Sequence, residues 1–158
     1  MIIAVDPGVS GGISVHYYNC ASYEIHKIPV GRDSILALFQ LLKKRALGKK
    51  VQCWIEAQPK TTGRKRPESR AIVQGENYGF VQMAALACGF NIVDVTPQKW
   101  QNGLGVSCPK LSYEKRKKKF QADAINIYKG RIIPKKIIQQ VADSLLILEY
   151  AKRMEKFI

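Results

Sequence analysis

The sequence predicts a single α/β domain built on a mixed five-stranded sheet, in which three antiparallel strands are followed by two parallel ones. Three observations lead to this fold class. Residues 1–28 contain three short β-rich runs separated by chain breaks, and residues 29–158 alternate helix-like with strand-like segments. No linker or internal repeat divides the 158 residues, a length that suits one domain with a sizeable core.

The first strand is a short apolar run that ends in Asp6 and is stopped by a Pro-Gly pair. Consecutive apolar residues at 2–5 indicate a strand buried on both faces. Alternating, β-rich segments at 12–18 and 23–28 complete an antiparallel meander. The meander places a carboxylate at the end of a central strand, where an uncompensated charge is costly.

A helix and a further strand follow the meander. Apolar residues at helical spacing predict a helix over 35–42, with Asp33 or Ser34 as its N-cap and Gly48 as its end. Residues 51–56 then form a strand that again ends in a carboxylate. Repetition of a strand-terminal acid is the first sign of a site at one edge of the sheet.

The next helix is predicted over 69–88, with Gly89 as its C-terminal stop. Gly75 and Gly79 lie one turn apart inside it. Because glycine destabilises helices, this pair indicates close approach by another backbone. Either a neighbouring element of the same fold or a dimer partner could supply that backbone.

The remaining elements continue the alternation of strands and helices. They are a strand at 91–95, a short helix with Thr96 at N-cap and Pro97 at N1, a loop at 103–109, a helix capped by Ser112 that runs through Tyr128, and a last helix from Pro134 to the C-terminal end.

The charge balance favours a polyanionic partner. Lys and Arg number 26 against 12 acids, a formal net charge of +14. No basic helix with an aromatic apolar face is evident, so nucleic acid is favoured over a membrane surface.

No apolar run approaches the length of a bilayer span, and no signal-peptide pattern is present, so a cytoplasmic protein is expected. The cysteines form no CxxC pair or zinc pattern and are expected to be free thiols.

Three acids are predicted to converge. Asp6 and Glu56 would lie side by side if their strands were adjacent and parallel. Asp143 shares a helical face with Leu146 and Ile147, so it faces protein rather than water. Three such carboxylates require cations, and oxygen-only ligands suit Mg²⁺ or Mn²⁺. Two ions about 4 Å apart are the usual apparatus for in-line phosphodiester displacement.

Four motifs occur in order along essentially the whole chain. They are Asp6-Pro-Gly, Ile55-Glu56, Thr96-Pro-Gln-Lys-Trp and Val141-Ala-Asp-Ser-Leu-Leu. As an ordered set they resemble the RuvC Holliday-junction resolvases of the RNase H-like superfamily, the phage-borne branch in particular. The resemblance implies an RNase H-like fold, a homodimer, and nicking of four-way and other branched DNA with two Mg²⁺ ions, which Mn²⁺ can replace. It further implies a role in DNA recombination and repair, within a bacterial host cell if the protein is phage-encoded.

The resemblance also assigns roles to individual residues. By position, Asp6, Glu56 and Asp143 correspond to metal-binding catalytic acids. Lys115 matches a lysine that the family places near the active site. Lys99 is carried over as a contact to the DNA backbone, and Lys118, at the same basic helix start as Lys115, is expected to bind DNA.

Two departures from the family pattern bear on the chemistry. The family usually has a fourth acid one helical turn before the last Asp, where this chain has Gln140. An amide oxygen can ligate a metal but adds no charge. Relatives in bacteria also carry a junction-wedging aromatic in the loop after the second acid, whereas here no aromatic follows Glu56 before Tyr78.

The loop at 59–70 is basic instead. The side chains expected to bind DNA phosphates there are Lys60, Arg64, Lys65, Arg66 and Arg70. Because phosphate contacts carry no sequence information, this loop predicts recognition of branched DNA by shape and charge, with weak sequence preference.

Two alternatives to the nuclease remain open. One is a non-catalytic protein that binds branched DNA, with a metal site weakened by Gln140. The other is a nucleotide-binding domain of the actin and sugar-kinase type, in which the glycine-rich stretch 6–12 would serve as the phosphate loop. Proteins of that type need two such lobes, and this chain has the length of one.

Overall fold

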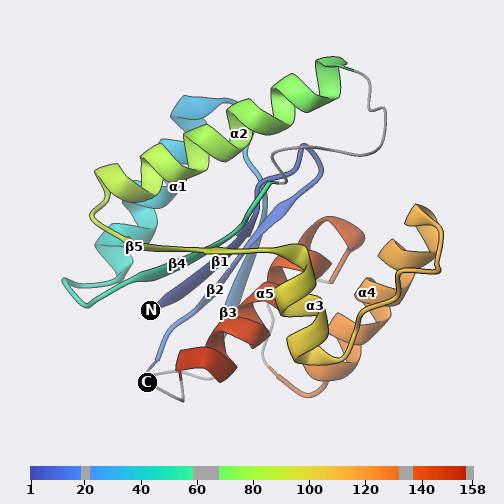
Figure 1. Cartoon of the computed structure of the whole chain (residues 1–158). Coiled ribbons are helices and arrows are strands. Elements are labelled where there is room, and N and C mark those ends of the chain that lie inside the picture. Colours follow the sequence, from blue (N-terminus) through green and yellow to red (C-terminus); the bar gives the residue numbers. More distant parts are fainter. Residues whose placement is uncertain (19–21, 59–67, 132–136, 156–158) are drawn as a thin grey trace.

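The computed structural model describes residues 1–18, 22–58, 68–131 and 137–155, apart from the side chains of Glu68 and Arg70. Within these residues a five-stranded sheet is covered by helices on both faces (Figure 1). The strands are β1 (Ile2–Asp6), β2 (Gly12–His16), β3 (Tyr23–Lys27), β4 (Gln52–Glu56) and β5 (Asn91–Val95). The helices are α1 (Arg32–Arg45), α2 (Glu68–Ala87), α3 (Pro97–Leu104), α4 (Tyr113–Ile127) and α5 (Gln139–Glu155).

The sheet confirms the predicted mixed topology. Its strand order is β3-β2-β1-β4-β5, with β1 at the centre. The pairs β1–β2 and β2–β3 are antiparallel, whereas β1–β4 and β4–β5 are parallel. The parallel pairing of β1 with β4 brings the carboxyl ends of these two strands to the same edge.

Two hydrophobic layers sandwich the central strand. Ile3 and Val5 pack with α1 and α2 on one face of the sheet. Ile2 and Ala4 face α3, α4 and α5 on the other. All four side chains are buried, which confirms that β1 is enclosed on both faces. None of the described helices is long and apolar enough to cross a membrane.

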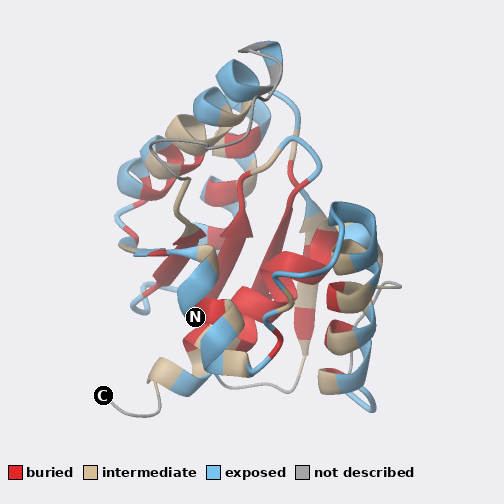
Figure 2. Ribbon diagram, turned by 45° about the vertical axis from the view of Figure 1, so that its right-hand side comes forward, coloured by how far each residue is buried: buried red, intermediate tan, exposed pale blue. Residues whose placement is uncertain are grey.

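Helix α5 is the principal element of the second layer, and it is buried over most of its length (Figure 2). Its first turn lies directly on β2 at Gly12, where an added Cβ would stand 2.6 Å from the backbone oxygen of Gln140 and 2.9 Å from Val141 Cα. A buried hydrogen bond of 2.7 Å between Ser14 and Ser144 joins the same two elements. Gly12 therefore sets how closely the start of α5 approaches the sheet.

Several predicted boundaries are corrected by the structure. Helix α1 begins at Arg32 with Gly31 as N-cap and no side-chain cap, so neither predicted cap is correct. Asp33 instead lies in the first turn, where its charge complements the helix dipole. Helix α3 continues past residue 103 and ends at Gly105 in the left-handed conformation. Helix α5 begins at Gln139, whereas the predicted start at residue 134 lies outside the described residues.

We expect Gly12→Ala to lower the free energy of unfolding by about 2 kcal/mol, because overpacking a tight contact costs about 1–3 kcal/mol. Ser10→Ala, at an exposed position in the turn that precedes β2, should leave stability unchanged and serves as the control. Chemical denaturation followed by circular dichroism measures both. Equal stability of the two variants would show that the packing of α5 on β2 does not require glycine at position 12.

Candidate functional site

Two acids end neighbouring parallel strands, and a third lies on the helix that covers them. Val5 of β1 pairs with Ile55 of β4, so the next residues, Asp6 and Glu56, emerge at the same edge of the sheet. Asp143 lies in the early turns of α5, which packs across β1 and β2. Asp6 and Asp143 are only 7% and 5% exposed. The three acids singled out in the sequence thus share one edge of the fold.

The turn after β1 fixes the orientation of Asp6. The backbone N–H of Gly8 donates a hydrogen bond of 3.0 Å to Asp6 Oδ1. The turn closes tightly, because a Cβ on Gly11 would collide with the backbone oxygen of Asp6. Asp6 Oδ1 is therefore held by the backbone, while its second oxygen, Oδ2, faces α4 and the lysine described next.

An ammonium group from α4 lies between two of the acids. The Nζ atom of Lys117 is 2.6 Å from Asp143 Oδ2 and 3.9 Å from Asp6 Oδ2. Burial alone lowers the pKa of Lys117, but attraction by Asp143 and Asp6 outweighs it and raises the pKa above its ordinary value. Lys117 therefore stays protonated and offsets part of the acids' negative charge.

The resemblance places Lys115 beside the acids, whereas the structure places Lys117 there. Lys115 is exposed on α4 and forms no ion pair within the described part of the chain. Two positions along an α-helix correspond to a rotation of about 200°. Lys115 therefore points away from α5 when Lys117 points toward Asp143.

Glu56 is held by a residue whose role the sequence analysis missed. The indole Nε1–H of Trp100, a fully buried side chain on α3, donates a hydrogen bond of 3.0 Å to Glu56 Oε1. Burial, together with the negative charges of Asp6 and Asp143, raises the pKa of Glu56 to about 8, while this hydrogen bond opposes the rise. The Thr-Pro-Gln-Lys-Trp motif contained the residue, but no local pattern shows that a tryptophan side chain reaches the adjacent strand end.

Asp143 keeps one oxygen without a partner. Its Oδ2 binds Lys117, but its Oδ1 is buried and accepts no hydrogen bond from any described residue. Burial raises the pKa of Asp143, with Lys117 opposing the shift. An unsatisfied buried oxygen is costly and indicates that another group belongs beside it.

The donor set fits a hard divalent cation, with one steric condition. All candidate donors are oxygens, and the unpartnered oxygen of Asp143 lies among them. Gln140 lies one helical turn before Asp143 and is partly buried. As they are placed, however, no three His, Cys, Asp or Glu side chains of the described residues are arranged to hold a metal ion. Because Lys117 bridges two of the acids, it must move aside for an ion to bind.

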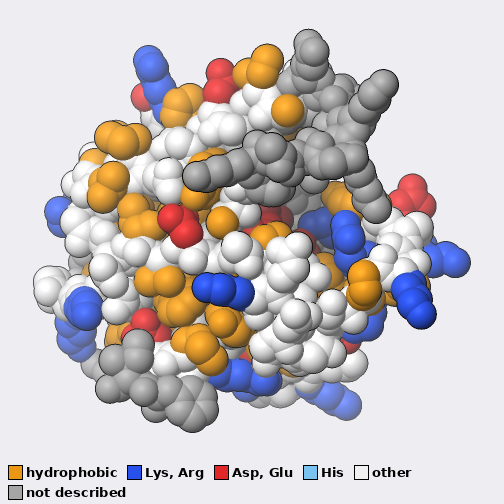
Figure 3. Space-filling model, viewed as in Figure 1, with side chains coloured by type: hydrophobic (Ala, Val, Ile, Leu, Met, Phe, Trp, Pro, Cys, Tyr) orange, Lys and Arg blue, Asp and Glu red, His pale blue; other side chains and the backbone are white. Residues whose placement is uncertain are grey.

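The residues predicted to bind DNA form no ion pair with the three acids within the described part of the chain. Lys99 and Lys118 are exposed, on α3 and α4 respectively. Lys and Arg side chains gather over α4 on the face that Figure 3 shows. The predicted loop contacts at Lys60 and at 64–66 lie outside the described residues, as does the side chain of Arg70.

Comparison with known proteins rests on structure. No protein-family model matches the chain, and no curated protein matches it. A structure of Thermus thermophilus RuvC in complex with a Holliday junction substrate matches with a TM-score of 0.59 and 16% identity, covering 98% of this chain and 95% of that one. A second T. thermophilus RuvC structure matches with a TM-score of 0.54 and 17% identity, covering 98% and 96%. As predicted, the chain has the RNase H-like fold seen in RuvC.

Proposed function

We propose that this protein is a structure-selective endonuclease that hydrolyses phosphodiester bonds in branched DNA, four-way junctions in particular. The observation that carries the proposal is the meeting of Asp6, Glu56 and Asp143 at one edge of the sheet, on a chain whose net charge is +14. Similarity in fold to a RuvC bound to a Holliday junction supports the choice of substrate.

In this proposal the three acids hold Mg²⁺, for which Mn²⁺ can substitute, at two ion positions. The amide oxygen of Gln140 is a further candidate ligand, one turn from Asp143. When bound, such ions activate the attacking water and stabilise the leaving oxygen. The chain itself orients the ligands: Gly8 holds one oxygen of Asp6, and Trp100 holds one oxygen of Glu56.

Lys117 takes the role that the resemblance gave to Lys115. With the metal absent, its ammonium stabilises the pair of buried aspartates. Displaced from Asp143, the same group remains at the edge of the site, where it can donate to a phosphate oxygen. The same side chain thus neutralises carboxylates before DNA binds and phosphate afterwards.

Exposed cations around this edge are proposed to hold the DNA backbone. Lys99 and Lys118 are accessible for this purpose. The basic residues at 59–70 remain predicted contacts; residues 68–70 belong to the start of α2, and residues 59–67 lie outside the described residues. Because these are phosphate contacts, recognition is expected to follow the shape of the branch rather than its sequence.

A non-catalytic protein that binds branched DNA is the second candidate. It is favoured by two observations, the neutral Gln140 at the expected position of a fourth acid and the Lys117 bridge between two of the proposed metal ligands. Nicking of a synthetic four-way junction in Mg²⁺ or Mn²⁺ distinguishes the enzyme from this alternative.

Helix α2 is proposed as the interface of a homodimer. An apolar stripe on it comprises Ile72, Gly75, Gly79, Met83 and Leu86, which fall within about 80° of arc at 100° per residue. A Cβ added at either glycine would meet nothing within 4 Å among the described residues. Of the two interpretations of the glycine pair, an intramolecular neighbour therefore finds no support, and a second copy of the chain accounts for the stripe.

We expect Asp6→Asn, Glu56→Gln and Asp143→Asn each to abolish nicking while junction affinity stays within about twofold, because the acids serve the metal and the basic residues bind phosphate. Nicking and gel-shift assays on the same junction measure the two properties. Asp123→Asn, which removes an acid paired with Lys119 on α4, is the matched control and should retain activity. If all three variants lost junction binding together with nicking, the acids would have a structural role rather than a catalytic one.

Lys117→Met should lower the free energy of unfolding in EDTA by roughly 3 kcal/mol, because it removes one partner of a buried ion pair. Mg²⁺ should restore part of that stability, since a cation can replace the ammonium. Nicking should fall by about 10²-fold, the usual cost of removing an electrostatic interaction with the reacting group. Lys115→Met, at an exposed position, should change none of these three measurements. If Lys115→Met lowered stability and nicking while Lys117→Met did not, the role near the active site would belong to Lys115 instead.

Met83→Glu combined with Leu86→Glu should shift the dimer toward monomer in sedimentation velocity, because it puts charge into an apolar interface. Ile125→Glu, a change of the same kind at an exposed apolar residue of α4, is the control and should leave the dimer intact. A wild-type chain that sediments as a monomer, both free and bound to junction DNA, would exclude this assembly.

A further inference from the structure

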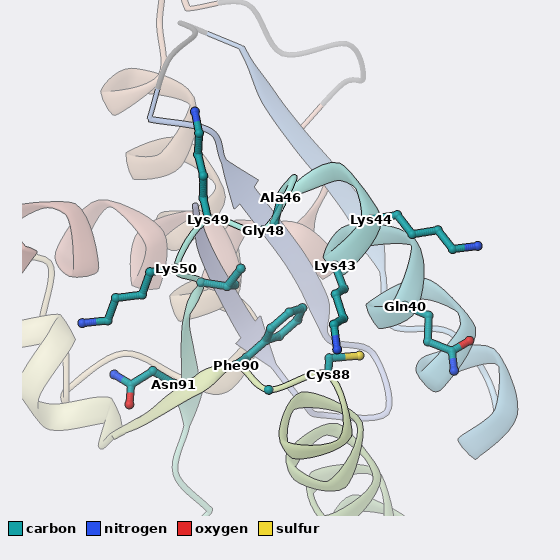
Figure 4. Close-up of a pocket in the computed structure, with 12 residues that line it drawn as sticks. Gln40, Lys43, Lys44, Ala46, Gly48, Lys49, Lys50, Cys88, Phe90 and Asn91 are labelled. Atoms are coloured by element: carbon teal, nitrogen blue, oxygen red, sulfur yellow. The ribbon is translucent and has the colours of Figure 1, made fainter.

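A second basic region lies at the opposite end of the sheet from the acids. It surrounds an open cavity of about 1070 Å³ where the end of α1, the segment leading into β4, and the turn between α2 and β5 come together (Figure 4). The acids lie where β1 and β4 end, whereas this cavity lies where β4 and β5 begin. The two regions are therefore separated by the length of the strands.

The rim of the cavity carries four lysines and no acid. The lysines are Lys43, Lys44, Lys49 and Lys50, and none of the described residues that line the cavity is Asp or Glu. Lys43 and Lys44 lie in the last turn of α1, where positive charge also stabilises the helix dipole. Lys49 and Lys50 follow the helix, so the dipole does not account for them. In Figure 4, Lys43 points toward Cys88, whereas Lys44, Lys49 and Lys50 extend outward in three different directions.

The floor of the cavity is apolar. Phe90 is 6% exposed, and its ring stacks on Phe39 of α1 with centroids 5.9 Å apart. Buried Ala46 and Val51 adjoin it. An apolar floor beneath a ring of cations suits a ligand with a flat, weakly polar body and negatively charged groups at its edge.

Two amide side chains stand in the walls. Gln40 projects from α1, and Asn91, which donates a hydrogen bond to Gln52, lies at the start of β5. Asn and Gln amides match the donor and acceptor edges of nucleobases. The cavity is about the size of typical small-molecule sites, whose volumes run from about 300 to 1,000 Å³.

We propose that this cavity binds a nucleotide unit, with its phosphates held by the lysines and its base placed over the Phe90 floor. The site uses no residue of the acidic edge and goes beyond the proposed nuclease activity, since occupying it requires no cleavage. The nucleotide can come from a nucleic-acid strand that passes behind the cutting edge or from a free nucleotide. Both carry the same chemistry and are separated by experiment.

The test is a titration of the ¹⁵N-labelled full chain with dATP and, separately, with a hexameric oligodeoxythymidine. We expect amide shifts at Gly48, Gly89, Phe90 and Asn91 with the ligand that binds there. Shifts with both ligands assign the site to free nucleotides as well as strands, shifts with dATP alone assign it to free nucleotides, and shifts with the oligonucleotide alone assign it to strands. For the oligonucleotide, the double variant Lys43→Gln with Lys50→Gln should reduce the log–log salt slope by about 0.7 for each phosphate that is no longer neutralised.

The matched control is Arg32→Gln with Lys129→Gln, which removes the same charge from exposed positions outside the cavity and should leave the slope unchanged. Asp143→Asn should leave the cavity shifts intact, so failure of the nuclease proposal and failure of this one are distinguishable. The proposal is overturned if the cavity amides do not shift, if the two double variants weaken binding equally, or if a hexaglutamate peptide shifts the same amides as strongly as the oligonucleotide.

Discussion

The repulsion among three carboxylates at one edge of a buried sheet is the constraint on which much of this structure depends. Each acid is held by a different kind of group: a backbone N–H for Asp6, an indole N–H for Glu56 and an ammonium for Asp143. These groups come from the turn after β1, from α3 and from α4. The helical layer over this face therefore both fills the core and compensates the charge.

Helix α4 shows how one basic segment divides its charges between two roles. Lys117 turns inward to Asp143, and Lys119 pairs with Asp123 on its own helix. Lys115 and Lys118 remain exposed. The angle of each lysine around the helix axis thus decides whether it contacts the interior or the solvent. The number of lysines in the sequence therefore does not give the number that are exposed for binding.

Much of the fold followed from short-range signals. The apolar run before Asp6 and the alternating segments after it predict the three antiparallel strands, and the Thr-Pro pair predicts the start of α3, because burial and capping act on neighbouring residues. The convergence of Asp6 and Glu56 also followed, since parallel strands bring their ends together, and the helical face of Asp143 predicted that it points into the protein. The sequence alone does not show how each packed helix is rotated about its own axis. The choice between Lys115 and Lys117, and the reach of Trp100 to Glu56, depend on how α3 and α4 dock against α5, which no local pattern records.

The position of Asp6 in the first strand and of Asp143 in the last described helix has a consequence for biosynthesis. The two residues are far apart along the chain, and they meet only when α5 packs across β1 and β2. Contacts of such high sequence separation form late and slowly relative to local ones. Assembly of the acidic edge therefore requires α5 to be synthesised and to pack against β1 and β2. A chain that ends before α5 lacks Asp143 and therefore lacks the complete set of acids.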